Sequence, residues 1–257
     1  MTSPIKSFRS DLHVHTVLSP CAEVEMIPPL IVERALALGI DIIAITDHNS
    51  TANIPSVQKA AEGFPLVVLP GMELQTREEI HSLCLFDTFE QANQLQKIVE
   101  STFARIKNRP DFFGEQFVVD ETGEFIRRED QLLLTSSSLS LNEASKIVID
   151  LGGLFIPAHV NRKAFGLLAN LGFIPIDIKI EALEISKHLD IKTAKSTIPQ
   201  LSNYPLILNG DVHRLSDFYG EMTFHIKKPS ILEIRLALSN SQERFVSFAS
   251  SSNEKIV

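Results

Sequence analysis

Cysteine is scarce in this sequence, with only Cys21 and Cys84 among 257 residues. Two cysteines are too few for a disulfide framework, which predicts a reducing compartment. Long apolar runs are also missing. Residues 1–10 lack the run of roughly 7 to 15 apolar residues of a secretory signal, and no later stretch approaches the about 20 that span a bilayer. We therefore expect a cytoplasmic protein with no membrane partner.

Positive charge is in deficit, because 24 Lys and Arg residues face 32 Asp and Glu residues and leave a net charge of −8. A negative field repels a polyanion, which argues against a long nucleic acid as partner and favours a small phosphorylated substrate or a nucleotide. The sequence also has neither a glycine-rich phosphate loop nor a Gly-x-Ser-x-Gly elbow, so nucleotide-driven work and serine hydrolysis lack their usual signals. Composition leaves the oligomeric state open.

The absence of internal repeats and low-complexity segments favours one domain over residues 1–257. Apolar stretches of strand length alternate with segments of helical spacing, a pattern typical of the α/β class with a mainly parallel sheet or barrel. The expected strands are residues 9–15, 41–46, 65–69, 80–86, 154–158, 182–185 and 206–208, and the expected helices are residues 28–39, 53–62, 142–151 and 230–238.

Residues 112–140 break this alternation. Residues 116–119 and 124–127 have strand character and flank the turn-like residues 120–123, which predicts a β-hairpin inserted into the domain. The insertion either covers a functional site or is an exposed decoration without a role in catalysis, and the sequence leaves both alternatives open.

Imidazoles and carboxylates gather at or just after the carboxyl ends of the expected strands, the edge where ligands bind in parallel α/β folds. They are His13, His15, Asp47, His48, Glu73, His159, Asp211 and His213. Residues two apart on a strand face the same side, so His13 with His15, and Asp211 with His213, can point into one cavity. Buried imidazoles and carboxylates need partners, and metal coordination satisfies all of them.

The mixture of nitrogen and oxygen ligands suits Zn²⁺, Mn²⁺ or Fe, whereas a Ca²⁺ site is nearly all oxygen and a structural zinc site is rich in cysteine. The number of ligands is too large for one ion, so we expect two or three divalent metal ions. His188 and His225 lie outside this pattern, and we interpret them as surface or strand-end residues.

Six motifs resemble those of the polymerase-and-histidinol-phosphatase (PHP) phosphoesterases. They are Asp-Leu-His-Val-His-Thr at residues 11–16, Ala-Ile-Thr-Asp-His-Asn at 44–49, Pro-Gly-Met-Glu at 70–73, Ile-His at 80–81, Pro-Ala-His at 157–159 and Gly-Asp-Val-His at 210–213. Each motif is weak alone, but their order across most of the chain is specific. The resemblance implies a distorted (β/α)₇ barrel of the PHP fold, with the hairpin region inserted, and a metal-dependent phosphoric ester hydrolase.

The resemblance also implies a division of the ligands. One ion is held by His13, His15, Glu73 and Asp211; a second by Glu73, His81 and His159; and a third by His48 and His213. Asp47 is then expected to orient an imidazole by hydrogen bonding from outside the coordination sphere.

One loop departs from the family pattern. Many members follow the first two histidines with Ser-Asp-Gly, whose aspartate completes the third site, and here Pro20 stands in its place. Cys21, Glu23 or Glu25 can substitute as ligand, Cys21 as a thiolate, or the third site is weak or absent. Cys84 lies in an apolar run, which indicates a structural thiol.

The function that follows is hydrolysis of a phosphate ester by metal-activated water, on a small phosphorylated metabolite or a nucleotide. Arg162 and Arg214 are candidates for bidentate phosphate contacts, or are merely solvated. His48 or His213 is a candidate proton donor for the leaving oxygen, provided it is free of metal.

Two alternatives stay open. The first is an exonuclease or a nucleoside-bisphosphate phosphatase acting on short nucleic acid, for which residues 105–109 and the pair Arg127 and Arg128 would have to form a basic groove. The second is a non-catalytic, metal-binding accessory domain, which would bind metal without hydrolysing phosphate esters.

Overall fold

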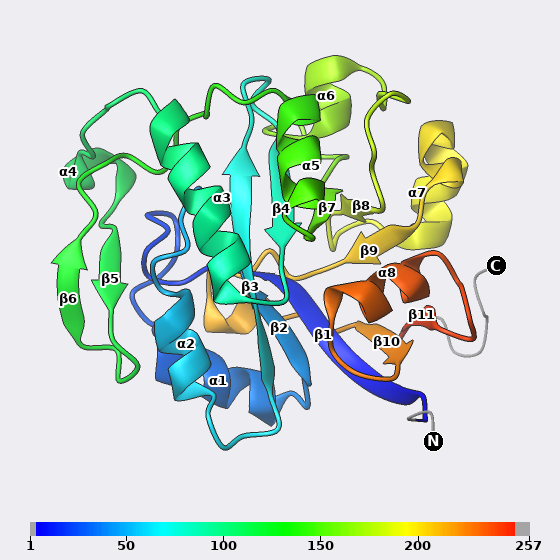
Figure 1. Ribbon diagram of the computed structural model, residues 1–257, viewed down its shortest axis with the longest axis horizontal. Helices are drawn as coiled ribbons and strands as arrows, with labels where there is room; N and C mark the ends of the chain where they lie inside the picture. The colour runs from blue at the N-terminus through cyan, green and yellow to red at the C-terminus, as the bar shows by residue number, and fades with distance from the viewer. Residues whose placement is uncertain (1–3, 250–257) are drawn as a thin grey trace.

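The computed structural model describes residues 4–249, which form one curled seven-stranded sheet and two small two-stranded sheets (Figure 1). The large sheet has the order β11-β10-β1-β2-β3-β4-β7, and β5 pairs with β6 and β8 with β9. The strands are β1 (Lys6–Val14), β2 (Ile42–Ile45), β3 (Val67–Gln75), β4 (His81–Leu85), β5 (Phe117–Val119), β6 (Phe125–Arg128), β7 (Leu154–Pro157), β8 (Leu183–Ile185), β9 (Leu206–Leu208), β10 (Met222–Ile226) and β11 (Phe245–Phe248).

The expectation of a mainly parallel sheet is wrong. Strand β2 lies parallel to β1 and β3, but β4 pairs antiparallel with β3 and β7, and β10 pairs antiparallel with β1 and β11. Residues 76–80, between β3 and β4, are too few for the crossover connection that parallel neighbours need. Strands β10 and β11 were not predicted, although β10 alternates buried apolar residues with half-buried polar ones, as a strand does.

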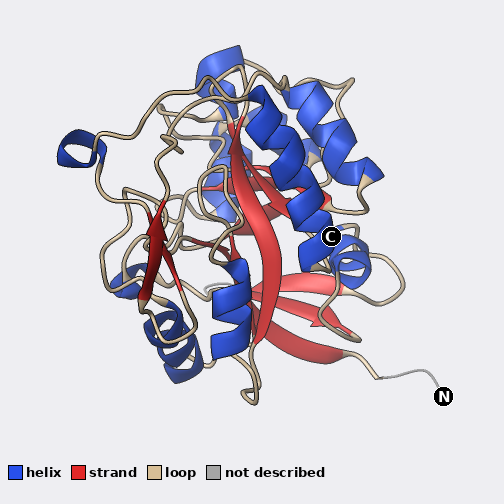
Figure 2. Cartoon of the chain, turned by 60° about the vertical axis from the view of Figure 1, so that its left-hand side comes forward, coloured by secondary structure: helices blue, strands red, loops and turns tan. Residues whose placement is uncertain are grey.

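Eight helices are seen in the described residues, and most of them lie outside the curved sheets (Figures 1 and 2). They are α1 (Pro28–Ala37), α2 (Ile54–Ala60), α3 (Phe89–Thr102), α4 (Pro110–Phe113), α5 (Leu141–Asp150), α6 (Leu167–Leu171), α7 (Ile191–Thr197) and α8 (Ile231–Leu238). Helix α3 is missing from the predicted elements, although its capping box of Thr88 and Gln91 is a recognisable start signal. Within residues 4–249, no helix has the length and apolar character to cross a membrane.

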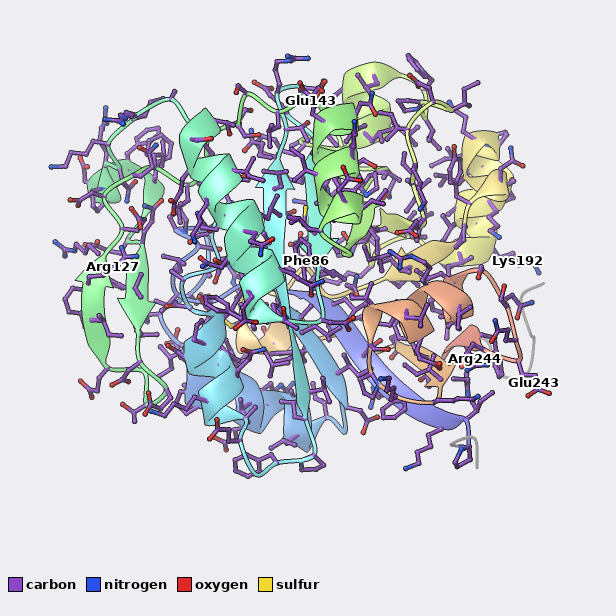
Figure 3. All side chains as sticks on the ribbon, viewed as in Figure 1. Phe86, Arg127, Glu143, Lys192, Glu243 and Arg244 are labelled. Carbon is purple, nitrogen blue, oxygen red and sulfur yellow. The ribbon has the colours of Figure 1, made fainter. Side chains whose placement is uncertain are left out.

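Apolar side chains between the sheet and the helices form the core. Phe86, labelled in Figure 3, is fully buried and lies against Gly153, where an added Cβ would come within 2.4 Å of the ring. Glycine is therefore required at residue 153 for the close approach of the chain to this ring.

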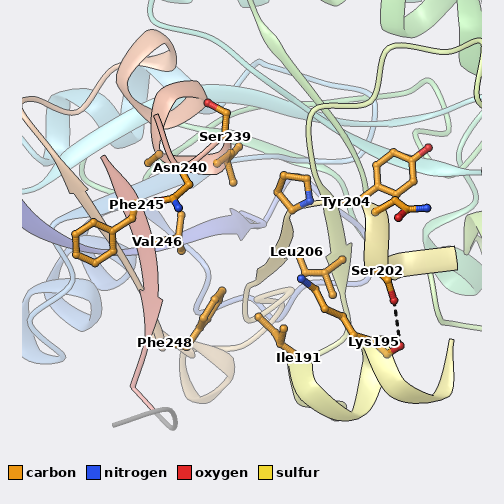
Figure 4. A pocket seen from close by; sticks show the side chains of 14 residues that line it. Ile191, Lys195, Ser202, Tyr204, Leu206, Ser239, Asn240, Phe245, Val246 and Phe248 are labelled. Carbon is orange, nitrogen blue, oxygen red and sulfur yellow. Dashed lines mark hydrogen bonds between the residues drawn. The ribbon is translucent and has the colours of Figure 1, made fainter. Parts of the chain in front are cut away.

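The two sides of the barrel are joined differently at its two ends. Val14 at the end of β1 forms a backbone bridge with Val212, in the segment after β9. Further along, β9 and the edge strand β11 belong to different sheets, and a cavity of about 320 Å³ lies between them, lined by Leu206, Val246 and Phe248 among others (Figure 4). Backbone bonds therefore join the two sides of the barrel beside the predicted site, whereas a cavity lined by side chains separates them at the other end.

The expected hairpin forms, with β5 antiparallel to β6, and it stands apart from the large sheet (Figure 2). It is nevertheless attached to the loops that follow β1 and β2. Asn53 donates to the Phe117 carbonyl at 3.0 Å, and Val118 packs with Leu18 and Leu133 in a small apolar cluster. That residues 112–140 are an insertion into the domain remains a prediction.

Candidate metal centre

Six imidazoles and two carboxylates from six parts of the sheet meet in the structure. Strand β1 supplies His13 and His15, the loop after β2 supplies His48, β3 supplies Glu73 and β4 supplies His81. His159 lies two residues beyond the end of β7, and the segment after β9 supplies Asp211 and His213. His81 begins β4 rather than ending it. Because β4 runs antiparallel, its first residue pairs with the last residue of β3 and reaches the same edge.

Glu73 lies at the middle of this cluster. Its Oε1 is 2.9 Å from His81 Nδ1, 3.1 Å from His159 Nε2 and 3.3 Å from His13 Nε2. Its Oε2 is 2.9 Å from His48 Nδ1 and 3.4 Å from His15 Nε2. One carboxylate therefore contacts five imidazoles, which suits a group shared between ions.

Asp211 reaches the cluster by a route that strand spacing did not predict. It lies beyond the end of β9 in a left-handed conformation, with φ of 48°, so its closeness to His213 does not come from strand periodicity. Its Oδ1 is 3.3 Å from His13 Nε2 and 3.5 Å from His213 Nδ1. Its other oxygen accepts a hydrogen bond from Arg162. The strained backbone conformation at Asp211 thus directs its carboxylate into the cluster.

Several polar atoms in the cluster are buried without a hydrogen-bond partner among residues 4–249. They are His13 Nε2, His15 Nε2, His81 Nε2, His159 Nδ1 and Glu73 Oε2, whose 2.9 Å contact with His48 Nδ1 lacks the alignment of a hydrogen bond. Their concentration is unusual, because buried polar groups in folded proteins nearly always have partners. Three groups of ligand atoms within 4.8 Å of one another occur here: His13, His15 and Glu73; His48, Glu73 and His81; and His15, His48 and His213. The residues therefore fit a centre of metal ions.

The pKa values reflect the same crowding. Burial alone would raise the pKa of Glu73, but His81, His13 and His48 outweigh it and hold the pKa well below its usual range. Burial likewise opposes charge on His13 and His48. The pKa of His13 is nevertheless raised well above its ordinary range by Glu184 and Glu73. The pKa of His48 is raised well above its ordinary range by Glu73 and Cys21. Burial, together with neighbouring imidazoles, instead lowers the pKa of His15, and it lowers the pKa of His81 to about 4, so the carboxylates support positive charge on only some of the imidazoles.

Glu184, on β8, is a buried carboxylate that the sequence analysis did not identify. Both of its oxygens lie 3.1 Å from His13 Nδ1, and it accepts hydrogen bonds from the His159 backbone at 2.9 Å and from Asn209 Nδ2 at 2.7 Å. It therefore fixes the His13 ring with Nε2 toward the centre. A lone acidic residue between Leu183 and Ile185 in an apolar strand was the available signal.

Asp11 supports the opposite side of the centre. It accepts hydrogen bonds from the backbone of Gly210 and of Tyr219, both at 2.9 Å, and so fixes the segment that carries Asp211. Burial raises the pKa of Asp11 to about 6 in spite of these bonds.

The expected role of Asp47 needs a correction, because its carboxylate does not bond directly to an imidazole. It accepts hydrogen bonds from the Thr16 backbone, from Thr16 Oγ1 and from Ser19 Oγ, all at 2.7 Å. Ser19 Oγ in turn lies 2.9 Å from His15 Nδ1. Asp47 therefore orients His15 through the Ser19 hydroxyl, a relay that depends on how the loop after β1 folds back.

The loop with the departure from the family pattern brings Cys21 to the centre. Its Sγ is 3.2 Å from His48 Nε2. Burial favours the neutral thiol, but His48 and His213 outweigh it and lower the pKa of Cys21 to about 6. Glu23 forms a 2.9 Å ion pair with Arg214 instead, and Glu25 is exposed.

A cavity of about 240 Å³ opens onto the centre, and Cys21, Arg162, Phe165 and His213 are among its lining residues. The Phe165 ring stacks on His81 with centroids 4.4 Å apart. Arg162 also lines a neighbouring cavity of about 190 Å³ together with the exposed His188. Arg214 is absent from the linings of both cavities.

His225 lies away from this edge, on β10. Its ring contacts Ser7 and Ser247 on the neighbouring strands and stacks on Phe245. Two histidines, His188 and His225, are thus outside the cluster, and the six others form it.

A family model described as the PHP domain matches residues 11–150. Among curated proteins, the 5'-3' exoribonuclease Rnm of Salmonella typhimurium is 36% identical over 75 residues, which are 28% of this chain and 25% of Rnm. The uncharacterized protein YqxK of Bacillus subtilis is 24% identical over 274 residues, covering 93% of this chain and 64% of YqxK. The chain thus spans less than two thirds of the length of either relative.

Solved structures share the fold. The lesion-specific endonuclease PfuEndoQ from Pyrococcus furiosus matches with a TM-score of 0.68 at 20% identity, over 94% of this chain and 58% of that one. An endonuclease Q complex with a 27-mer duplex substrate matches with a TM-score of 0.66 at 19% identity, over 93% and 58%. A candidate metal-dependent phosphoesterase from Bifidobacterium adolescentis matches with a TM-score of 0.55 at 18% identity, over 86% and 89%.

The family model covers more than half of the chain and includes the motifs that supply His13, His15, His48, Glu73 and His81. The remaining ligand-type residues come to the same centre from later strands, and the structural relatives have the same fold. The chain therefore belongs to the PHP domain family.

Proposed function

We propose that the chain is a metal-dependent phosphoric ester hydrolase. The unpartnered, buried nitrogen and oxygen atoms around Glu73 carry this proposal, since a fold keeps such atoms only where a ligand completes them. When bound, divalent ions neutralise phosphate oxygens and lower the pKa of water toward neutrality.

The contacts support the division of the ligands among three ions that the resemblance to the PHP family implies. His13, His15, Glu73 and Asp211 lie close enough to hold one ion, and Glu73 Oε1, which contacts both His81 and His159, links this position to a second. His48 and His213 form a third group with His15. Zinc, manganese and iron all suit these donors.

Arg162 is the residue of the chain best placed to bind phosphate. Its guanidinium lines the cavity above the centre, is half-exposed and already contacts a carboxylate oxygen of Asp211. A guanidinium can bind two oxygens of a phosphate in the same bidentate way in which it binds the two oxygens of a carboxylate. Arg214 is a weaker candidate, because it pairs with Glu23 and both side chains are exposed.

The two roles proposed for His48 and His213 exclude each other, because a nitrogen bound to metal cannot donate a proton. We assign both to metal, since their ligand atoms lie within 4.8 Å of each other and of His15. The proton for the leaving oxygen then comes from solvent at the open side of the cavity.

The test is phosphate release by metal-free protein reloaded with Mn²⁺, Zn²⁺ or Fe²⁺, on a panel of phosphomonoesters and nucleotides. Metal-dependent turnover that is lost in Glu73→Gln and kept in His225→Ala is the expected result. Metal bound in stoichiometric amounts with no turnover on any substrate would favour the accessory-domain alternative instead.

A nuclease is the second candidate, and one groove beside the hairpin contains the basic residues that it would need. A cavity of about 740 Å³ between α3 and the hairpin is lined by Arg105, Lys107 and Arg127, the last labelled in Figure 3. Glu129 and Asp130 line it too, and Arg127 pairs with Glu129 at 2.8 Å, so the groove is mixed in charge. The net charge of −8 does not decide against nucleic acid, because a local groove and bound cations determine the field that a strand meets.

Oligonucleotides with and without a 5' phosphate separate the two candidates. For a nuclease, the double variant Arg105→Glu with Lys107→Glu should lose oligonucleotide cleavage while it keeps turnover of a small phosphomonoester. Equal effects on both substrates, or none on either, would mean that this groove does not bind the oligonucleotide.

A further inference from the structure

The loop between β1 and α1 holds Cys21 in a fixed place. The Ala22 backbone donates to the Ser19 carbonyl and the Glu23 backbone donates to the His213 carbonyl, both at 2.9 Å. Cys21 immediately precedes these two anchored residues and lies inside the turn from Ser19 to Ala22, and its Sγ is 3.2 Å from His48 Nε2. The thiol is therefore attached by backbone bonds to the segment that carries His213, and its side chain meets the ring of His48.

A second observation at the same place points to a ligand. His15 Nε2 is fully buried and has no hydrogen-bond partner within residues 4–249. It belongs to the group of three imidazoles, His15, His48 and His213, whose ligand atoms lie within 4.8 Å of one another. Of the three groups of ligand atoms in the centre, this one contains no carboxylate. Three imidazoles can hold a zinc ion with one position left open, and an anionic partner at that position would offset part of the charge of the ion.

We propose that Cys21 supplies this partner, so that one position of the centre is bound through the Cys21 thiolate together with His48 and His213. This inference rests on the proposed metal centre and adds the identity of one donor. Sulfur is a soft ligand, and a thiolate beside imidazoles is typical of zinc, whereas Mn²⁺ and Mg²⁺ prefer oxygen. The position should therefore select Zn²⁺ while the positions around Glu73 accept harder ions as well.

The rival interpretation is that Cys21 and His48 form a reactive thiol and imidazole pair that binds no metal. Both interpretations predict a reactive thiol in metal-free protein. They differ once metal is added, because coordination removes the thiolate from reaction and gives it a spectroscopic signature.

The experiment titrates Co²⁺, as a substitute for zinc, into metal-free full-length protein and records the near-ultraviolet charge-transfer band of a thiolate bound to cobalt. Wild type and Cys84→Ala should show the band, because the Cys84 side chain is fully buried in the apolar core. Cys21→Ser should lose it together with about one equivalent of bound Zn²⁺. Cys21→Asp should lose the band, recover the metal equivalent and bind Mn²⁺ there more tightly than wild type does.

Protection from alkylation provides an independent measurement. One equivalent of tightly bound Zn²⁺ should slow iodoacetamide labelling of Cys21 by at least tenfold. A wild-type protein that binds metal and hydrolyses phosphate esters without the band would overturn the thiolate ligand alone. Retention of the band in Cys21→Ser would overturn it too. A protein that binds no metal at all would overturn both this inference and the proposed function.

Discussion

Two buried polar clusters in this molecule differ in whether their polar atoms have hydrogen-bond partners. Around Glu73, imidazole and carboxylate atoms are packed together and several have no hydrogen-bond partner. Near the carboxyl end of the described chain, Arg244, labelled in Figure 3, donates to both oxygens of Glu233 at 2.9 and 3.1 Å. The Lys227 backbone donates to Glu233 as well, at 2.8 Å.

The difference separates a ligand site from a structural one. Within residues 4–249, none of the unpartnered buried side-chain atoms belongs to Glu233 or Arg244, so this pair is complete as it stands and ties α8 to the loop before β11. The cluster around Glu73 keeps unpartnered atoms, which the proposed cations would complete. Burial alone does not distinguish the two clusters, whereas the accounting of hydrogen bonds does.

The largest effect should come from Glu73→Gln, which removes the carboxylate that contacts five imidazoles. We expect phosphatase activity to fall roughly 10³-fold and bound metal to fall by at least one ion per chain. Elemental analysis and phosphate release measure both. The His225→Ala variant, changed outside the cluster, should match wild type, and equal losses in the two variants would invalidate the site.

A smaller effect is expected from Glu184→Gln, which weakens the support of His13 without removing a ligand. Metal affinity should fall by about 10- to 100-fold, as is typical when a residue that orients a ligand is changed. Competition with a metal chelator measures the affinity. At saturating metal the activity should largely recover, and a loss that excess metal does not repair would mean that Glu184 acts in some other way.

The next effect concerns pH and the two cysteines in metal-free protein. The pKa of Cys21 is lowered to about 6, and because the thiolate is the nucleophile, its alkylation rate should rise about tenfold between pH 5 and pH 7. Burial raises the pKa of Cys84, which should stay unlabelled over this range. Mass spectrometry of the labelled peptides distinguishes the two residues, and a midpoint near pH 8.5 would contradict the contact with His48.

The smallest effect on the centre should come from Glu233→Gln, which breaks the complete cluster. We expect the Tm to fall by roughly 5 °C, since one partner of a buried ion pair loses its charge. Metal content and activity per folded molecule should stay unchanged. Thermal unfolding with elemental analysis tests this, and a loss of metal at unchanged Tm would reverse the assignment of the two clusters.

The sequence predicted the centre better than it predicted the sheet. Histidines and carboxylates after apolar strands indicated a metal site, because such groups have few other ways to be buried. The direction of β4 was not predictable from its composition, since parallel and antiparallel strands bury the same apolar residues. Helix α3 and strand β10 were missed although the sequence contains their signals, a capping box before α3 and alternating apolar residues in β10.

By itself, the sequence determined the family, the α/β class and the ligand-type residues, because motifs and apolar periodicity are local properties of the chain. Tertiary structure alone decided that His81 reaches the centre from the start of an antiparallel strand, that Glu184 and Ser19 orient His13 and His15, and that Cys21 rather than Glu23 lies beside His48. The contacts of Glu184 and Cys21 join residues far apart in the chain, and the geometry of all these contacts depends on how strands and loops pack, which no local pattern records.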